Sequence, residues 1–429
     1  MKNKKETLLI LTILITICII IFNRDKLYEA KYTEPKDTLL AITINGEIST
    51  TFPTTNAYIG TVECTTGTGK VEWNGTKWVL TTSGITKGST KCNATFITKV
   101  PTFAETILAN NEVKTPITTP GAAISTASEA LLASTEDDYG TSYYFRGAVK
   151  NNYVQFANKC WRIVRVGGDG SVKLILHNDN TAGASNPCDA ANNSASAAFA
   201  RYSGTTYKSA FNSNYNDNAY VGFKYGTPGS STYATTHANT NNSTILTNLE
   251  TWYTNNLKDY ADKIVDTVWC NDKTNVTDKT YDPYNWSNVN GFGYAKNVTY
   301  YGAVQRLVSK SGSAGGTGPS LKCNGELNKI NLKIGLISAD ELAYAGYAAF
   351  LENTTTYLQE NATDTYWWSL SPGRFGGDSA GVWYVGGSGG GFGGGGVNNT
   401  FAVRPSISLK PSTNVTGNGT SNTPYIISM

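Results

Sequence analysis

The sequence predicts an α+β fold with long loops, and three observations support it. Short apolar and aromatic runs separated by turn-forming residues follow one another over residues 366–410, as in a small antiparallel sheet. Helical periodicity is confined to short segments, of which the clearest follow Ser243 and Ser338, and Ser338 with Glu341 matches a capping box. These elements are interleaved among long polar loops, which favours α+β over α/β.

Residues 1–26 predict a single-pass membrane anchor. An uncharged apolar run over residues 7–22 follows a lysine-rich start and precedes Arg24. As a helix this run would extend about 24 Å, which suits a short anchor or the apolar part of a signal peptide. No small-residue cleavage site follows it. We therefore expect an uncleaved anchor helix in the cell membrane, with the remaining domains outside the cell.

The charge of the chain argues against a nucleic-acid partner. Residues 1–26 hold five basic and two acidic residues, so the rest of the chain, with 30 of each, is neutral. A neutral chain lacks the electrostatic footprint that a polyanion requires. Only 16% of all residues are charged, and tyrosine, glycine and small polar residues dominate instead. This composition suits β-rich extracellular domains.

Six of the seven cysteines lie beyond the predicted anchor and are widely spaced, with no CxxC pair. The spacing argues against zinc, and export would permit disulfides. Buried, reduced thiols are the alternative. Pairing by nearest neighbours, one of 15 connectivities that six cysteines allow, predicts Cys64–Cys92, Cys160–Cys188 and Cys270–Cys323.

Composition divides the exported part into four segments. Residues 38–100 predict a small all-β module, in which Asn74-Gly75 between Trp73 and Trp78 is a strong hairpin signal. The Pro/Thr- and Ala/Ser-rich residues 101–134 predict a linker with weak helix. The main domain is expected over residues 135–410, in which Gly167–Gly170 predicts a second hairpin turn. Residues 411–429 are expected to form a tail with one short strand.

Several separated blocks of the main domain resemble a known family. They are residues 136–147, 160–165, 335–346, 367–372, 382–385 and 402–409. These blocks resemble a domain of unknown function that is common in surface proteins of gut Gram-positive bacteria. Its layout is similar to the C-type-lectin-like fold shared with formylglycine-generating enzymes. The resemblance implies a C-type-lectin-like domain over residues 135–410 and implies no known reaction.

The sequence offers little catalytic or metal-binding chemistry. His177 and His237 have no partners at ligand spacing, and no nucleophile elbow or phosphate loop is present. No cysteine follows Cys323, although the formylglycine-generating branch needs cysteines there. Residues 212–217 place oxygen atoms at alternate positions but contain one carboxylate, which favours a solvated turn over a calcium site. We predict no catalytic residue, metal ligand or cofactor, with calcium as the alternative.

The predicted ligand-binding surface is formed by loops 373–379 and 386–400. In lectin-like folds, loops near the C-terminal strands form the ligand face, and here aromatic residues flank them. Alternation along a strand would turn about half of these rings inward. Arg404 is expected to be a buried structural arginine with a carboxylate partner. The predicted binding residues are Trp367, Trp368, Arg374, Trp383, Tyr384, Phe392, Asn398 and Asn399.

Nine of the eleven residues from Gly386 to Gly396 are glycine. We interpret this run as a flexible loop. An alternative hypothesis is a diversified region, in which a retroelement has mutated the adenines of asparagine codons.

These features predict a cell-surface binding or adhesion protein that recognises an extracellular glycan or protein and performs no catalysis. Two alternatives remain. One is an enzyme on the same fold that acts on cell-wall or host polymers, and the other is a structural, pilus-like surface protein.

Overall fold

The computed structural model describes residues 39–86, 88–202, 207–285 and 291–427, and it is built mainly from β-sheet. Strands account for 34% of the residues and helices for 13%, so the predicted α+β class is wrong. Part of the difference arises where a predicted linker forms a strand. Ala130–Asp137 is β7, and it pairs along its whole length with β8 (Gly140–Gly147). Tertiary pairing with a neighbouring strand has overridden a weak local helical preference.

The prediction of a single-pass membrane protein is not supported. Across the described ranges, no helix has the length and apolar character needed to cross a membrane. The apolar run at residues 7–22, on which the prediction of an anchor depended, lies outside the described residues.

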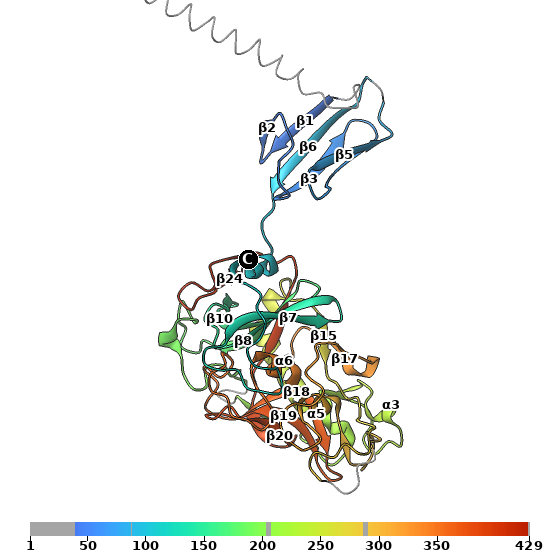
Figure 1. The fold of residues 1–429 in the computed structure, drawn as a ribbon, viewed down its shortest axis with the longest axis vertical. Helices are drawn as coiled ribbons and strands as arrows, with labels where there is room; N and C mark the ends of the chain where they lie inside the picture. Colours follow the sequence, from blue (N-terminus) through green and yellow to red (C-terminus); the bar gives the residue numbers. More distant parts are fainter. Residues whose placement is uncertain (1–38, 87, 203–206, 286–290, 428–429) are drawn as a thin grey trace, which may run out of the picture. The chain divides into compact units, whose positions relative to one another are not determined.

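The chain divides into two compact units, Met1–Val100 and Pro101–Met429. The described part of the first unit is a small β-module whose four-stranded sheet has the order β2-β1-β6-β3 (Figure 1). Its core includes Leu40, Ala94 and Phe96. A separate hairpin pairs Trp73 with Trp78 across the predicted turn, with the ring centroids 5.9 Å apart. The strands are β1 (Leu39–Ile44), β2 (Glu47–Ser49), β3 (Tyr58–Cys64), β4 (Thr68–Trp73), β5 (Trp78–Ser83) and β6 (Lys91–Thr98).

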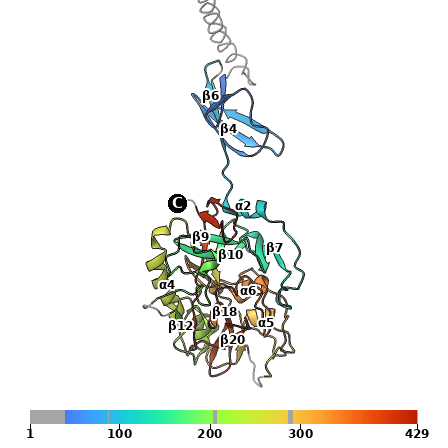
Figure 2. The same ribbon diagram turned by 90° about the vertical axis from the view of Figure 1, so that its left-hand side faces the viewer.

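The second unit contains two larger sheets. The first has eight strands and includes the predicted hairpin around Gly167–Gly170, which joins β10 to β11. Figure 2 labels β7, β9 and β10 of this sheet. The C-terminal tail adds β24 in parallel to β9. Besides β7 and β8, the strands are β9 (Tyr153–Phe156), β10 (Lys159–Val166), β11 (Val172–Asn178), β22 (Ser406–Leu409), β23 (Val415–Thr416) and β24 (Tyr425–Ile427).

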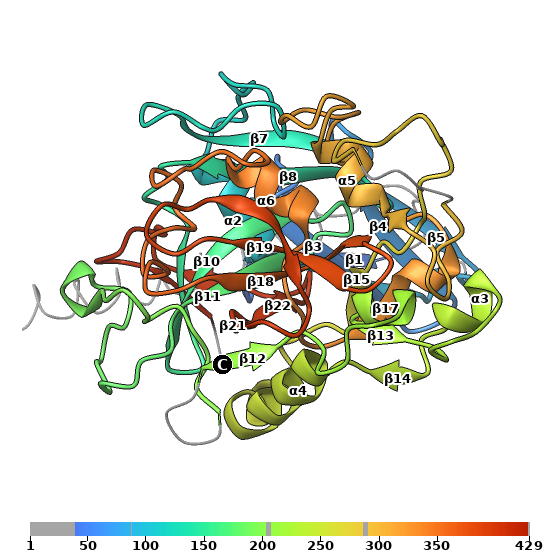
Figure 3. The ribbon, with the colours of Figure 1, turned by 90° about the horizontal axis from the view of Figure 1, so that it is seen from below.

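The second sheet carries the predicted binding segments. Its strand order is β12-β21-β18-β19-β20, and β16 pairs with β18 (Figure 3). The glycine-rich run forms its terminal strand, so much of this run is regular structure and not a flexible loop. The strands are β12 (Lys208–Ala210), β16 (Thr299–Tyr300), β18 (Trp367–Phe375), β19 (Ala380–Val385), β20 (Phe392–Gly396) and β21 (Thr400–Ala402).

The helices of the second unit are short, and their caps explain where they begin. Thr102 and Ser338 each form a capping box with a glutamate three residues later, and Gly346, with φ of +125°, follows the last residue of α6. The helices are α2 (Phe103–Asn110), α3 (Tyr233–Thr236), α4 (Thr244–Asn256), α5 (Gly302–Leu307) and α6 (Ala339–Ala345). Two-stranded pairs complete the unit: β13 (Lys224–Tyr225) with β14 (Asn241–Asn242), and β15 (Thr267–Cys270) with β17 (Lys329–Leu332).

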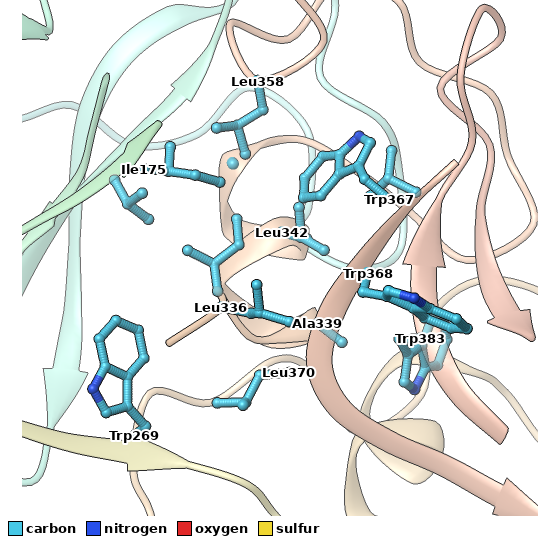
Figure 4. Close-up of a cluster of buried hydrophobic side chains, with 14 of the residues drawn as sticks. Ile175, Trp269, Leu336, Ala339, Leu342, Leu358, Trp367, Trp368, Leu370 and Trp383 are labelled. Carbon is cyan, nitrogen blue, oxygen red and sulfur yellow. The ribbon is translucent and has the colours of Figure 1, made fainter. Parts of the chain in front are cut away.

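The main core surrounds α6. Figure 4 shows Leu336 and Leu342 between Ile175 of β11 and Trp367 of β18. Helix α6 and the residues just before it therefore fill the space between the two sheets. Every residue of α6 is buried. A helix this short gains its stability from such packing and not from its own propensity.

Three disulfides join the pairs expected from the sequence, Cys64–Cys92, Cys160–Cys188 and Cys270–Cys323. The first links β3 to β6 in a module whose core is small. Disulfides of this kind are typical of an extracellular protein.

Candidate binding groove

Four of the predicted binding residues lie in the hydrophobic core. Trp367, Trp368, Trp383 and Phe392 are each at most 1% exposed. Figure 4 shows the three tryptophans among other buried hydrophobic side chains. Both faces of β18 are covered: Trp368 packs against Phe401 at 4.5 Å between ring centroids, and Trp367 lies against the α6 side. Successive side chains of β18 point to opposite faces of the sheet, but neither face meets solvent. Neither tryptophan of this strand is therefore exposed. These four rings therefore offer no exposed face to a ligand.

The remaining predicted residues occupy different surroundings. Tyr384 is half-buried and belongs to the groove described below. Arg374 places its guanidinium carbon 5.3 Å from the ring centroid of Tyr284, within the range of a cation–π contact. Asn398 and Asn399 are exposed in the turn between β20 and β21, outside the lining of the groove.

Three aromatic side chains form a partly exposed cluster at the second sheet. Tyr366, Tyr384 and Phe401 lie with ring centroids 5.2–5.3 Å apart in every pairing. Tyr366 is 49% exposed, and the other two are half-buried. Burial, together with the neighbouring Tyr366, raises the pKa of Tyr384, so its hydroxyl stays protonated at neutral pH. The cluster thus presents neutral, amphipathic ring surface to solvent.

The glycines next to these rings are required by close packing. A Cβ at Gly395 would lie 3.0 Å from the Tyr384 ring, and one at Gly386 would lie 3.0 Å from the backbone nitrogen of Gly391. Gly390 has φ of +60°, and a Cβ there would come within 2.2 Å of the Asn353 carbonyl oxygen. These positions accept glycine because larger residues would displace the rings or strain the turn.

A second set of contacts holds residues 386–391, which we call the glycine turn, against the preceding segment, residues 359–365. The Gln359 side-chain amide is buried and donates to the carbonyl oxygens of Gly386, at 3.2 Å, and Gly387. A Cβ at Gly387 would lie about 3 Å from the backbone of Thr363 and Thr365. At the other end of the turn, the Asn353 N–H donates to the Gly390 carbonyl oxygen at 3.4 Å. The turn is therefore anchored at both ends and leaves a depression between the two segments.

This depression is an open groove of about 730 Å³, which we call the aromatic groove. Its charged side chains are two carboxylates, Glu352 and Asp364. Asp364 accepts a hydrogen bond from the Tyr207 hydroxyl, a contact that raises the pKa of that tyrosine. The lining consists of Phe350, Glu352, Thr363, Asp364, Thr365, Tyr366, Tyr384, Gly386, Gly387, Ser388, Gly389, Gly391, Phe392 and Gly393.

Comparison with known families identifies one segment of the chain. Residues 302–411 match the model of a domain of unknown function, DUF6273. The match contains the whole lining of the aromatic groove, and it bears out the expected resemblance to a domain of unknown function. The matching model carries no assignment to lectins or formylglycine-generating enzymes, so those parts of the resemblance have no support. No curated protein and no solved structure matches the chain.

A second polar site lies between α6, β10 and β11, around a small cavity of about 50 Å³. Glu341 accepts from Lys173 at 2.6 Å and from Arg165 at 3.0 Å, and Arg165 also pairs with Asp137. Arg306 bridges Asp340 and Asp272, each at 2.6 Å. We call these seven side chains the charge network: Asp137, Arg165, Lys173, Asp272, Arg306, Asp340 and Glu341.

The charge network is satisfied internally. Burial alone would raise the pKa of Glu341, but Lys173, Arg165 and the backbone of Ser338 lower it to about 2. Each of the other charged groups in the network has an oppositely charged partner within 2.9 Å. The sequence pattern predicts only a local capping role for Glu341, as the partner of Ser338. It missed the network because its members come from residues 137–173 and 272–341, which only the fold brings together.

Other expected sites have structural roles. Asp217 lies in the segment considered as a calcium site. Its carboxylate accepts hydrogen bonds from the backbone N–H groups of Ala219 and Gly229, both at 2.9 Å. Within the described ranges, no cluster of three or more His, Cys, Asp or Glu side chains is placed to hold a metal. Arg404 is buried as expected, but it donates to the carbonyls of Leu176 and Leu358 and makes none of the ion pairs found among the described residues. The expected carboxylate partner is therefore wrong.

Proposed function

We propose that the protein binds an extracellular glycan in the aromatic groove. The observation that carries this proposal is the exposed ring of Tyr366 beside Tyr384 in an open groove of about 730 Å³. Aromatic rings with a polar edge suit the apolar faces and hydroxyl rims of sugars. The side-chain-free glycines let a ligand approach the backbone closely.

The polar lining supports a glycan over a large protein partner. Thr363, Thr365 and Ser388 supply hydroxyl groups around the rings, next to the backbone of the glycine turn. A stable protein–protein interface buries about 800 Å² on each partner, which requires a far broader surface than this groove. The disulfides support an extracellular setting.

A glycan array followed by calorimetry on the purified protein tests the proposal. We expect Tyr366→Ala to weaken binding at least about tenfold, as truncation of a central interface tyrosine does. Tyr215, 44% exposed and outside the groove lining, supplies the control: Tyr215→Ala should bind as the wild type does. Silence across the array, or equal binding by Tyr366→Ala and the wild type, would refute the proposal.

A glycan hydrolase is the second candidate, because the groove contains two carboxylates, Glu352 and Asp364. Glycoside hydrolysis generally uses a pair of carboxyl groups on either side of the scissile bond. Chromatography of oligosaccharides incubated with the protein separates the two functions. Product formation that is lost in Glu352→Gln while binding persists would favour the hydrolase, and intact oligosaccharide would favour binding alone.

A further inference from the structure

The charge of the aromatic groove has one sign. Of its fourteen lining residues, Glu352 and Asp364 carry the formal charge at neutral pH, and the lining contains neither lysine nor arginine. Both carboxylates are exposed residues at the groove. A ligand that enters the groove therefore meets two carboxylates together with the electron-rich faces of tyrosine rings.

Glu352 stands over the floor of this groove. A Cβ on Gly389 would lie 2.7 Å from the Glu352 carboxylate oxygen, so this carboxylate rests against the glycine turn where a larger residue would push it away. Among the described residues, Glu352 makes neither an ion pair nor a side-chain hydrogen bond. Its position contrasts with Glu360, eight residues later, which pairs with Arg162 at 2.7 Å. The carboxylate of Glu352 is thus available to a ligand.

The rings next to the carboxylates add to the attraction for a cation. Tyr366 and Tyr384 contact each other, and the ring of Tyr366 also borders Gly386 at the floor. An ammonium group within about 6 Å of a tyrosine ring centroid is attracted by the negative face of the ring. Carboxylates and tyrosine faces that line one depression favour a cationic ligand and disfavour uronic acids and sulfated sugars.

We propose that the aromatic groove selects glycans that carry free ammonium groups, such as runs of glucosamine that are not N-acetylated. This inference depends on the proposed glycan binding and specifies its ligand class. The ammonium group pairs with Glu352, while the sugar ring stacks on Tyr366. Asp364, which already accepts from Tyr207, makes the smaller contribution.

Calorimetry with three tetrasaccharides tests this selectivity. The glucosamine, N-acetylglucosamine and glucose tetramers share a β-1,4 backbone and differ at the 2-position. At about pH 6, where model carboxyl groups are ionised, we expect the glucosamine tetramer to bind about tenfold more tightly than the other two. Glu352→Gln should remove most of this preference and keep the affinity for the neutral tetramers. Asp259→Asn, which neutralises an exposed carboxylate outside the groove lining, is the control and should keep the preference for the glucosamine tetramer.

The outcomes separate the two proposals. Equal binding of all three tetramers, or a preference that survives in Glu352→Gln, would overturn the cation selectivity and leave glycan binding standing. Failure of every tetramer and of the wider array would overturn both. A tetralysine probe distinguishes a peptide site: its binding in the absence of any glycan binding would likewise overturn both.

Discussion

Two polar regions of the second unit differ in how their charges are used. In the charge network, each of seven charged side chains meets an opposite charge around a cavity of about 50 Å³. In the aromatic groove, Glu352 faces an open space of about 730 Å³ without such a partner. Buried charges that are fully paired fix a structure, whereas an exposed carboxylate next to aromatic rings can pair with a ligand. We therefore expect the first region to control stability and the second to control binding.

The largest expected effect is on stability, in the charge network. Glu341→Gln removes the carboxylate shared by Lys173 and Arg165, and it leaves a buried lysine without its counter-ion. Breaking a buried pair in this way costs about 3–5 kcal/mol, which urea unfolding can measure. Glu352→Gln is the matched control, and its free energy of unfolding should stay within about 0.5 kcal/mol of the wild type. Equal effects of the two substitutions would remove the contrast between the regions.

Acid should weaken the same network. The pKa of Glu341 is about 2 in the folded protein, below its ordinary value of 4.5. A carboxyl group with a lowered pKa stabilises the fold fully above the unfolded value, and this contribution is lost as the pH falls from about 5 towards 2. The difference between these two pKa values corresponds to a contribution of about 3 kcal/mol to the free energy of unfolding. Unfolding curves between pH 6 and 3 should therefore show a steeper loss for the wild type than for Glu341→Gln, and parallel curves would contradict this.

Two adjacent glycines sharpen the comparison inside the groove. Gly390→Ala places a Cβ at a φ of +60° and 2.2 Å from the Asn353 carbonyl oxygen, so we expect a loss of about 2–3 kcal/mol. A Cβ at Gly391 would have no atom within 4 Å, and the backbone there has a conformation that other residues can adopt. Gly391→Ala should therefore leave the free energy of unfolding within about 0.5 kcal/mol of the wild type. Thermal unfolding separates the two. If both variants melt like the wild type, the glycine turn is not anchored as described.

Salt should produce the smallest effect and should act on one region only. Raising the ionic strength from about 0.05 M to about 0.5 M screens exposed charges far more than buried pairs. Binding of the glucosamine tetramer should weaken several-fold, while the stability difference between wild type and Glu341→Gln should change by less than about 0.5 kcal/mol. Calorimetry and urea unfolding at both salt concentrations measure these changes.

Local signals in the sequence predicted the features that depend on neighbouring residues. The hairpin turns at Asn74-Gly75 and Gly167–Gly170 and the capping box at Ser338 follow from residue preferences at fixed offsets. The three cysteine pairs follow from order along the chain.

Features that depend on the burial of both faces of a sheet were not predictable in this way. Strand alternation suggested that about half of the rings near β18 would be exposed, yet Trp367 and Trp368 are both buried because each face of β18 is covered. The groove is lined instead by Tyr366 and Glu352, whose roles depend on the glycine turn that folds back beside them.

The ion pairs of Glu341 have a consequence for the boundaries of the recognisable family segment. Glu341 lies within residues 302–411, but Lys173 and Arg165, which neutralise it, lie more than a hundred residues upstream. The final strand of the segment, β22, likewise takes its hydrogen-bonding partner from β11. A polypeptide excised at the limits of DUF6273 would carry an uncompensated charge and an unpaired strand edge. Residues 302–411 are therefore a portion of a larger folding unit, and a polypeptide meant to fold should begin well before residue 302.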